Sequence, residues 1–287
     1  MLKLLLGVVM ISLSAVWVKL VNVDPTAAAF YSMLSGGMVL LVWSLWCGDK
    51  LLPRRAVFIG LAAAALFFAL DLALWHRSIL FVGPGIATLL ANFQVILLAL
   101  AGVLLFGERA DWRFAGAIGL ALVGLVMLVG GEWASLSDNY KWGVVLGLLT
   151  AVCYAAYVLS LRNARVNTAS LSPRASIALL SLVCAAMLLL MTIGLGESLA
   201  IPRWQDAGWL LVYGITAQVL GWGLISQSLP GLPASKVGLL LLLQPVCAFI
   251  WDAVFFNRAF SVLELTGAAV ALVGIYLGTL KRQDSAA

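Results

Sequence analysis

Charged residues are scarce in this chain of 287 residues: Asp, Glu, Lys and Arg together make up 10%, whereas 64% of the residues are hydrophobic. A soluble domain carries roughly 25% charged residues, which keep its surface hydrated. The scarcity excludes a soluble globular protein, and we predict an all-α protein embedded in a lipid bilayer. The basic residues are scattered among loops, so we expect no nucleic-acid partner.

Motifs for metal binding and catalysis are also missing. The four cysteines lie in or beside apolar runs and show no CxxC or Cys/His spacing, which indicates packing rather than metal or redox chemistry. The chain has no GxxxxGK phosphate loop, no HExxH zinc motif and no GxSxG serine elbow. We therefore predict no catalytic residues, no metal site and no cofactor, and we do not expect an enzyme.

Ten apolar runs bounded by charged residues make up most of the chain. A run of about 20 apolar residues is long enough to cross the hydrocarbon core as a helix. The predicted spans are about Leu4–Val18, Pro25–Cys47, Ala56–His76, Phe81–Gly107, Phe114–Gly131, Trp142–Leu161, Ala175–Gly196, Ala207–Gln227, Val237–Phe256 and Leu265–Leu280. The loops between them are short, so consecutive helices should pack antiparallel.

The second half of the chain repeats the first at an offset of 150 residues: Gln94 corresponds to Gln244, and Ala121–Gly124 corresponds to Ala271–Gly274. Five predicted spans precede the longest connection, residues 132–140. An odd number of spans makes the second half enter the membrane from the opposite face. We therefore predict ten transmembrane helices arranged as two inverted five-helix repeats, residues 1–131 and 141–287, around a central cavity.

The positions of the basic residues predict the orientation. Twelve would lie on the side of the N-terminus: Lys3, Lys50, Arg54, Arg55, Arg109, Arg113, Arg162, Arg165, Arg174, Lys236, Lys281 and Arg282. Five would lie on the other side: Lys19, Arg77, Lys141, Arg203 and Arg258. The positive-inside rule then places both termini and the short tail in the cytoplasm and the 132–140 loop outside. We expect a multi-pass protein of a bacterial-type inner membrane, with no obligatory protein partner evident.

Two glutamines lie near the middle of equivalent spans. Gln94 and Gln244 are each about ten residues from a helix end, or roughly 15 Å, which is close to the midplane of the bilayer. Polar groups are costly inside lipid, and a charge at a helix centre costs roughly 2.5–3.5 kcal/mol. We predict that this pair lines the cavity and contacts a substrate; the alternative is a structural hydrogen bond between helices.

The third span ends with a second polar cluster. Asp71 and Trp75 are four residues apart and share a helix face, and His76 follows. Trp75 and His76 are candidate substrate contacts, and Asp71 is a candidate gating or coupling residue; the alternative is an interfacial belt in which Asp71 bonds to a neighbouring helix. Asp252, eight residues beyond Gln244, would lie in the outer part of the membrane and is the second candidate gate residue.

The remaining candidates are aromatic, polar, or helix-breaking. Trp17, Tyr154, Tyr157, Gln218 and Trp222 are predicted to complete the substrate-binding set, although ordinary core packing explains such aromatic residues equally well. Two glycine/proline clusters occupy corresponding places in the two halves and are candidate hinges, with a simple helix-start turn as the alternative. They comprise Gly83, Pro84 and Gly85 in the first half and Pro230, Gly231 and Pro233 in the second.

A family resemblance rests on several of these segments. They are Phe106-Gly107-Glu108-Arg109 after a small-residue helix, Gly116, Leu122-Val123-Gly124, and in the second half Gln244-Pro245 and Gly274. In these features the chain resembles the drug/metabolite transporter superfamily, in its EamA-like ten-helix branch. It departs from the pattern at Gln94-Val95, where proline is usual, and at Asn257-Arg258, where Gly-Glu is usual. The pair Trp75-His76 is similar to that of aromatic amino acid exporters.

The resemblance implies a secondary transporter that binds a small molecule and exports it by alternating access. The similarity to aromatic amino acid exporters implies that this small molecule is an amino acid. We therefore predict an inner-membrane exporter of aromatic or other neutral amino acids. The alternatives are a transporter of another metabolite class, such as a sugar derivative, nucleobase or drug, a membrane-embedded enzyme acting on lipid, and a channel or scaffold without alternating states.

Overall fold

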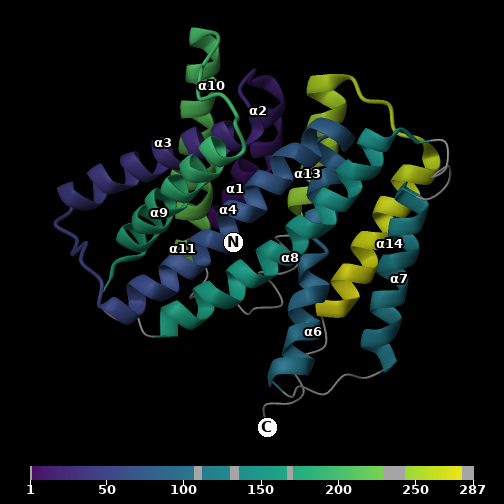
Figure 1. The fold of residues 1–287 in the computed structure, drawn as a ribbon. Coiled ribbons are helices and arrows are strands. Elements are labelled where there is room, and N and C mark those ends of the chain that lie inside the picture. The colour runs from purple at the N-terminus through teal and green to yellow at the C-terminus, as the bar shows by residue number, and fades with distance from the viewer. Residues whose placement is uncertain (1, 107–111, 130–135, 167–170, 229–242, 280–287) are drawn as a thin grey trace.

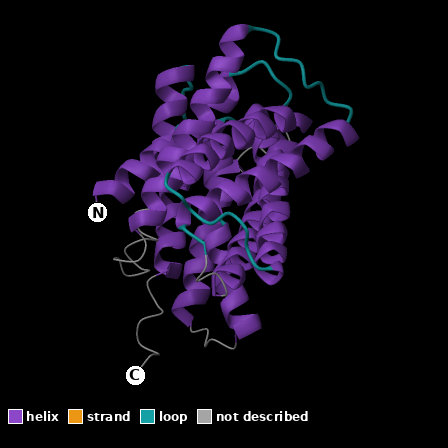
Figure 2. Cartoon of the chain, turned by 90° about the vertical axis from the view of Figure 1, so that its left-hand side faces the viewer, coloured by secondary structure: helices purple, strands orange, loops and turns teal. Residues whose placement is uncertain are grey.

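The structure is a computed structural model, and it describes residues 2–106, 112–129, 136–166, 171–228 and 243–279. Across these ranges the chain consists of helices joined by short loops, and no strand occurs among them (Figure 2). Five helical segments are long and apolar enough to cross a membrane, and five further apolar helices of 10–17 residues accompany them. The expected all-α architecture with ten apolar helices is therefore confirmed for the described part of the chain.

The helices follow one another in the order labelled in Figure 1. The first half contains α1 (Leu2–Ser12), α2 (Ser14–Leu20), α3 (Pro25–Trp46), α4 (Arg55–Val82), α5 (Pro84–Ala91), α6 (Gln94–Phe106) and α7 (Trp112–Val129). The second half contains α8 (Asp138–Val166), α9 (Pro173–Gly194), α10 (Trp204–Gly214), the π-helix η1 (Ile215–Trp222), α11 (Gly223–Ser228), α13 (Leu243–Phe256) and α14 (Val262–Thr279).

Helix α4 is longer than its sequence suggested. The predicted span ended at His76, where Arg77 supplies a charge, but the helix continues to Val82. The Arg77 guanidinium donates to the carbonyl oxygen of Ala73 in its own helix at 2.8 Å and forms an ion pair with Glu197. Because the charge is satisfied by protein groups, it does not terminate the helix.

The fourth predicted span is broken into α5 and α6 at Asn92 and Phe93. The Asn92 side chain donates to the carbonyl oxygen of Thr88 at 2.8 Å, and the Thr88 hydroxyl donates to that of Pro84 at 2.7 Å. Side chains that bond to nearby backbone groups compete with the helical pattern, and the backbone N–H of Val95 and of Ile96 here each bond three residues back. The break places Gln94 at the start of α6.

The two halves interlock through three large helix pairs. Helices α4 and α8, α3 and α9, and α7 and α14 pack together extensively, and Figure 1 shows α7 and α14 side by side at one edge of the molecule. A Cβ added to Gly124 on α7 would lie 2.6 Å from the Cα of Ala271 on α14. Conversely, a Cβ added to Gly274 on α14 would lie 2.8 Å from the Cα of Ala121 on α7. Small residues therefore let these helix backbones touch.

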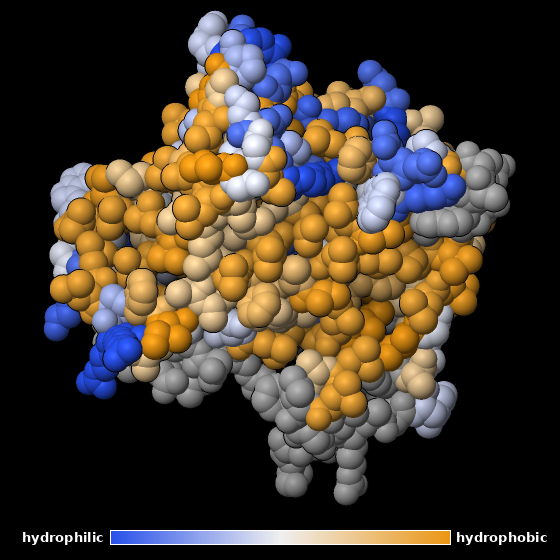
Figure 3. All heavy atoms as spheres, in the orientation of Figure 1, coloured by the Kyte–Doolittle hydropathy of each residue, from blue (hydrophilic) through white to orange (hydrophobic). Residues whose placement is uncertain are grey.

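The outer surface is suited to lipid. Large apolar side chains such as those of Leu104, Val126 and Leu190 are more than 60% exposed. Figure 3 shows apolar residues covering the middle of one face, with hydrophilic residues gathered toward its two ends. Such a continuous apolar surface is too large for a monomer in water, whereas it is expected for helices surrounded by acyl chains.

Candidate functional site

A central cavity of about 700 Å³, including its mouth, lies between helices of both halves. Its lining comes from α1, α2, α4, α5, α6, α8, α10, η1, α11 and α13, and the residues are Ile11, Ser14, Phe68, Asp71, Leu72, Trp75, Thr88, Ala91, Asn92, Gln94, Thr150, Tyr154, Tyr213, Ala217, Gln218, Trp222, Ile225 and Gln244.

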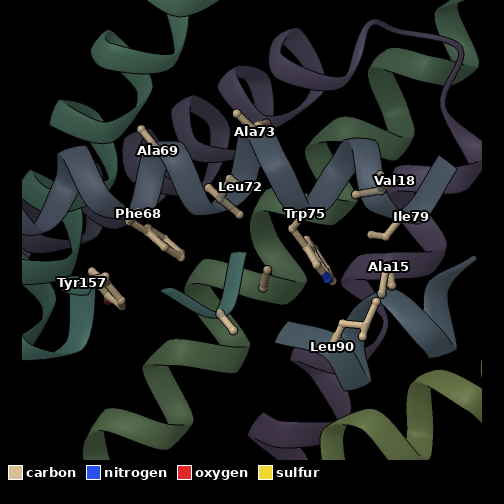
Figure 4. Packing of buried hydrophobic residues seen from close by; sticks show 14 of the residues in the cluster. Ala15, Val18, Phe68, Ala69, Leu72, Ala73, Trp75, Ile79, Leu90 and Tyr157 are labelled. Atoms are coloured by element: carbon tan, nitrogen blue, oxygen red, sulfur yellow. The ribbon is translucent and has the colours of Figure 1, made fainter. Parts of the chain in front are cut away.

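Helix α4 supplies the apolar wall of the cavity. Phe68, Leu72 and Trp75 recur at helical spacing and project from one side of α4, whereas Ala69 and Ala73 lie on the opposite side (Figure 4). Tyr157 stacks on the outer side of Phe68 with ring centroids 4.6 Å apart. The Tyr157 ring thereby holds the Phe68 ring in position at the cavity wall.

Three polar atoms at the cavity have no hydrogen-bond partner in the described part of the protein. They are Oδ1 of Asp71, Oε1 of Gln94 and Oγ of Ser14, and each atom is buried. Buried polar groups are normally paired, so an atom without a protein partner is a candidate to contact a ligand. Oε1 of Gln94 can only accept hydrogen bonds, and so can Oδ1 of Asp71 when that carboxyl group is ionised. The cavity therefore offers acceptors to the donors of a ligand.

The π-helix η1 places two further residues at the cavity. Gln218 and Trp222 both lie in this segment, which carries an extra residue per turn and so rotates side chains relative to an α-helix. Thr216 in the same segment accepts a hydrogen bond from Nε1 of Trp17 at 3.1 Å.

Six of the nine predicted substrate contacts line the cavity: Trp75, Gln94, Tyr154, Gln218, Trp222 and Gln244. The other three lie behind the lining. Tyr157 supports Phe68, and Trp17 stacks on Trp209 with ring centroids 5.3 Å apart. His76 is fully buried, with Nδ1 3.0 Å from the carbonyl oxygen of Pro25 and Nε2 3.0 Å from the hydroxyl of Tyr213.

The partners of His76 determine its tautomer. A carbonyl oxygen only accepts, so Nδ1 carries the proton and Nε2 accepts from the hydroxyl of Tyr213. Tyr213 lines the cavity and His76 does not. In this structure, His76 therefore acts on the cavity through Tyr213 by fixing the direction of its hydroxyl.

Sequence reasoning missed Ser14, Thr88, Asn92 and Thr150, which also line the cavity. Thr150 lies one helical turn before Tyr154, so a search for polar residues on the face of that tyrosine would find it. Ser14 carries no comparable signal, because serine bonds to its own helix backbone in many membrane helices.

Asp252, a predicted gate residue, is fully buried at one end of the molecule among cations. Its carboxylate oxygens lie 3.3 Å from Nζ of Lys19, 3.6 Å from Nη1 of Arg258 and 3.3 Å from the backbone nitrogen of Gly85. Arg258 also contacts the carbonyl oxygen of Val82 and lies 3.5 Å from Glu264. The cluster joins α2, α5, α13 and the start of α14, whereas Asp71 lies apart from it in the cavity lining.

Further ion pairs lie at the same end of the molecule as the Asp252 cluster. Glu197 accepts from the backbone nitrogen of Thr26 at 2.9 Å and pairs with Arg77. The Asp206 carboxylate pairs with Arg203 at 2.9 Å, which raises the pKa of the Arg203 guanidinium. The Arg77–Glu197 pair connects the first half of the chain to the second. The Arg203–Asp206 pair lies where the loop between α9 and α10 enters α10.

The predicted hinge in the first half coincides with a junction that requires glycine. Gly83 joins α4 to α5 at φ 87° and ψ 163°, a conformation that is essentially restricted to glycine, while Pro84 begins α5. Gly85 lies against the ring of Phe249 and donates to Asp252. The second-half candidates, Pro230, Gly231 and Pro233, lie outside the described residues.

These observations define a class: a polytopic membrane protein whose helices surround a partly polar cavity, which is the architecture of a membrane transporter. The sequence pattern of the EamA-like transporter family matches residues 1–130 and again residues 141–280. The chain belongs to that family.

Several known proteins are similar to the chain. An uncharacterized transporter of Archaeoglobus fulgidus is 24% identical over 280 residues, covering 96% of this chain and 94% of its own length. A probable amino-acid metabolite efflux pump of Salmonella typhimurium is 25% identical over 203 residues, covering 67% of this chain and 66% of its own length. One crystal structure aligns with 97% of this chain and 94% of its own at a TM-score of 0.67 and 20% identity, which shows a shared fold.

Proposed function

We propose that this transporter exports aromatic or other neutral amino acids across a bacterial-type inner membrane by alternating access, with both termini in the cytoplasm. The observation that carries the proposal is the composition of the cavity. Trp75 and Trp222 supply flat apolar surfaces, and Gln94 and Gln244 supply amide donors and acceptors. A small zwitterion with an apolar side chain needs both kinds of contact. The named efflux-pump relative gives further support for amino acids.

Reciprocal contacts support an inverted relation between the halves. On α7 and α14, Gly124 meets Ala271 and Gly274 meets Ala121, and the members of each equivalent pair differ by 150 in number. Such exchange of partners is typical of a twofold axis. These two helices are antiparallel, so a twofold axis relating them is perpendicular to their length. If both helices cross the bilayer, that axis lies in the plane of the membrane, as in inverted-repeat transporters.

The same relation pairs the residues of the cavity. Gly7 on α1 packs against Ile225 on α11, and Gly147 on α8 packs against Ser78 on α4. If these two contacts are equivalent, Gly7 corresponds to Gly147 and Ser78 corresponds to Ile225. This aligns α1 and α2 with α8, and α4 with the segment from α10 to α11. With these registers Asp71 corresponds to Gln218 and Trp75 to Trp222. Gln94 and Gln244 are already equivalent by sequence. A cavity built from equivalent side chains of two repeats is suited to opening alternately on either side.

We further assign the Asp252 cluster to the outer gate of this cycle. Lys19, Arg258 and the α4–α5 junction converge on a fully buried carboxylate, so separating these helices would leave charges unpaired. Closure at this end is thereby favoured until substrate contacts offset the cost. The gate involves Asp252 without Asp71, which belongs to the substrate cavity instead.

Counterflow in proteoliposomes tests the substrate. Vesicles preloaded with unlabelled tryptophan should accumulate labelled tryptophan, and phenylalanine or methionine should compete more strongly than a hexose phosphate or a nucleobase. Trp75→Leu should abolish counterflow. The matched control is Trp209→Leu, which removes a tryptophan that stacks on Trp17 outside the cavity lining. No tryptophan flux, or competition by the nucleobase alone, would reject an amino-acid substrate.

A further inference from the structure

Asp71 is the one charged side chain among the described residues that line the cavity, and no Lys, Arg or His there opposes it. It is 4% exposed, and its Oδ1 has no hydrogen-bond partner. The other two buried aspartates, Asp206 and Asp252, each have a cation within 4 Å. The environment of Asp71 therefore differs in kind from that of the structural carboxylates.

The ionisable groups on surrounding helices that lie near enough to interact with the charge of Asp71 are neutral at physiological pH. They are Cys153 and Tyr154 on α8, Cys184 on α9 and Tyr213 on α10. His76 on its own helix is engaged by Pro25 and Tyr213. From α2 and α6 the cavity receives the uncharged Ser14 and Gln94. No described protein group compensates a negative charge at this position.

We propose that Asp71 is the shared site of a proton and the substrate ammonium group, so that the transporter exchanges one proton for each small organic ammonium ion or ammonium-bearing zwitterion. The proposal rests on the transporter function above and specifies its substrate: a primary ammonium on an apolar or aromatic body. A carboxylate on the substrate is tolerated but not required, because the described lining presents no cation to bind it.

The chemistry of exchange balances without any further reactant. In the empty cavity the carboxyl group carries a proton, because an unpaired buried carboxylate is disfavoured. When R–NH₃⁺ enters, the proton leaves Asp71 for water at the open side, and the ammonium donates to the carboxylate and to the unpaired Oε1 of Gln94. On the other side, a proton from water replaces the departing ammonium. Proton and ammonium cannot occupy the carboxylate together, which couples their movements in opposite directions.

Charge movement then depends on the substrate. Exchange of one proton for tryptamine, a monocation, moves no net charge, whereas exchange of one proton for zwitterionic tryptophan moves one charge per cycle. A potassium diffusion potential with valinomycin should therefore change the proton-coupled flux of tryptophan and leave that of tryptamine unchanged. Equal sensitivity of the two fluxes would overturn the one-for-one exchange.

Binding can be tested on the purified wild-type protein. Calorimetric titration with tryptamine in two buffers that differ in ionisation enthalpy measures the protons released, and close to one proton per site is expected at neutral pH. Indole-3-propionate, which keeps the ring and the chain but has a carboxylate in place of the ammonium, should not bind. Tryptamine binding without proton release, no tryptamine binding, or equal binding of indole-3-propionate would each overturn the proposal.

Variants locate the released proton. Asp71→Asn should abolish the release and weaken tryptamine binding roughly tenfold or more, as expected for the loss of a charge-assisted hydrogen bond. Asp206→Asn, which alters a buried carboxylate paired with Arg203 outside the cavity, should retain the release. Release that persists in Asp71→Asn would assign the proton elsewhere. If Asp71→Asn does not fold, the wild-type calorimetry still decides.

The outcome is separable from that of the proposed function. Tryptophan counterflow without proton release on ligand binding would leave the exporter intact and overturn the shared site. Proton-releasing binding of tryptamine without any tryptophan flux would leave the shared site intact and reject the amino-acid substrate.

Discussion

Replacing Gly83 by alanine is expected to destabilise the protein more than replacing any solvent-facing glycine of similar backbone angle. Gly83 has φ 87° and ψ 163°, and a side chain in this region costs about 1–3 kcal/mol. The new Cβ would also lie 2.7 Å from Oδ2 of Asp252 and would collide with Arg258. Displacing Arg258 from the buried Asp252 carboxylate adds roughly 1 kcal/mol, the net value of one hydrogen bond, because Lys19 stays beside that carboxylate. The expected total is about 2–4 kcal/mol.

Gly48→Ala is the matched control, because Gly48 has φ 71° with nothing within 4 Å of the added Cβ. Only the backbone term of about 1–2 kcal/mol applies there. In detergent at one scan rate, the apparent unfolding temperature of Gly83→Ala should fall by roughly 4–8 °C, about twice the fall for Gly48→Ala or more. Equal shifts in the two variants would refute the contact between the α4–α5 junction and the Asp252 cluster.

Three further predictions concern other contacts. Gly124→Leu should lower the unfolding temperature strongly because the backbone of α14 lies against this glycine, whereas Gly119→Leu, which faces open space, should be tolerated; equal effects would contradict the packing. His76→Phe should cost about 1–3 kcal/mol in an unfolding assay by leaving a buried tyrosine hydroxyl without its acceptor, and an unchanged stability would contradict that bond. Arg174 holds the pKa of Asp49 at about 2, below its ordinary 3.8. The stabilisation lost in Asp49→Asn should therefore be full above pH 3.8 and vanish as pH falls through about 2; a difference that persists at lower pH would exclude this carboxylate.

Several residues of the cavity lining could be picked out from the sequence, but the partners of the buried polar groups could not. Gln94 and Gln244 were recognisable because they interrupt long apolar runs at equivalent positions. Asp252 and Asp71 interrupt such runs in the same way, yet the first is paired with Lys19 and the second has no partner. The difference lies in helices distant in sequence, which no local pattern encodes.

The aromatic residues give the same lesson at the level of helix faces. Trp17 and Trp75 look alike in sequence, each within an apolar run. Trp75 lines the cavity, whereas Trp17 bonds to Thr216 and stacks on Trp209. Rotation of a helix about its axis decides between these outcomes, and that rotation is set by the packing of neighbouring helices.

The sequence by itself determined the lipid surroundings of the chain, its helical class and the approximate ends of its helices. It did so because lipid permits a backbone to be buried only when its hydrogen bonds close within each segment, and because charge is tolerated only at the ends or at a compensated site. Only the tertiary structure decided where the helices break, which carboxylate is paired, and that His76 reaches the cavity through Tyr213. Those features depend on contacts between helices whose distance and rotation a linear pattern of apolar residues does not specify.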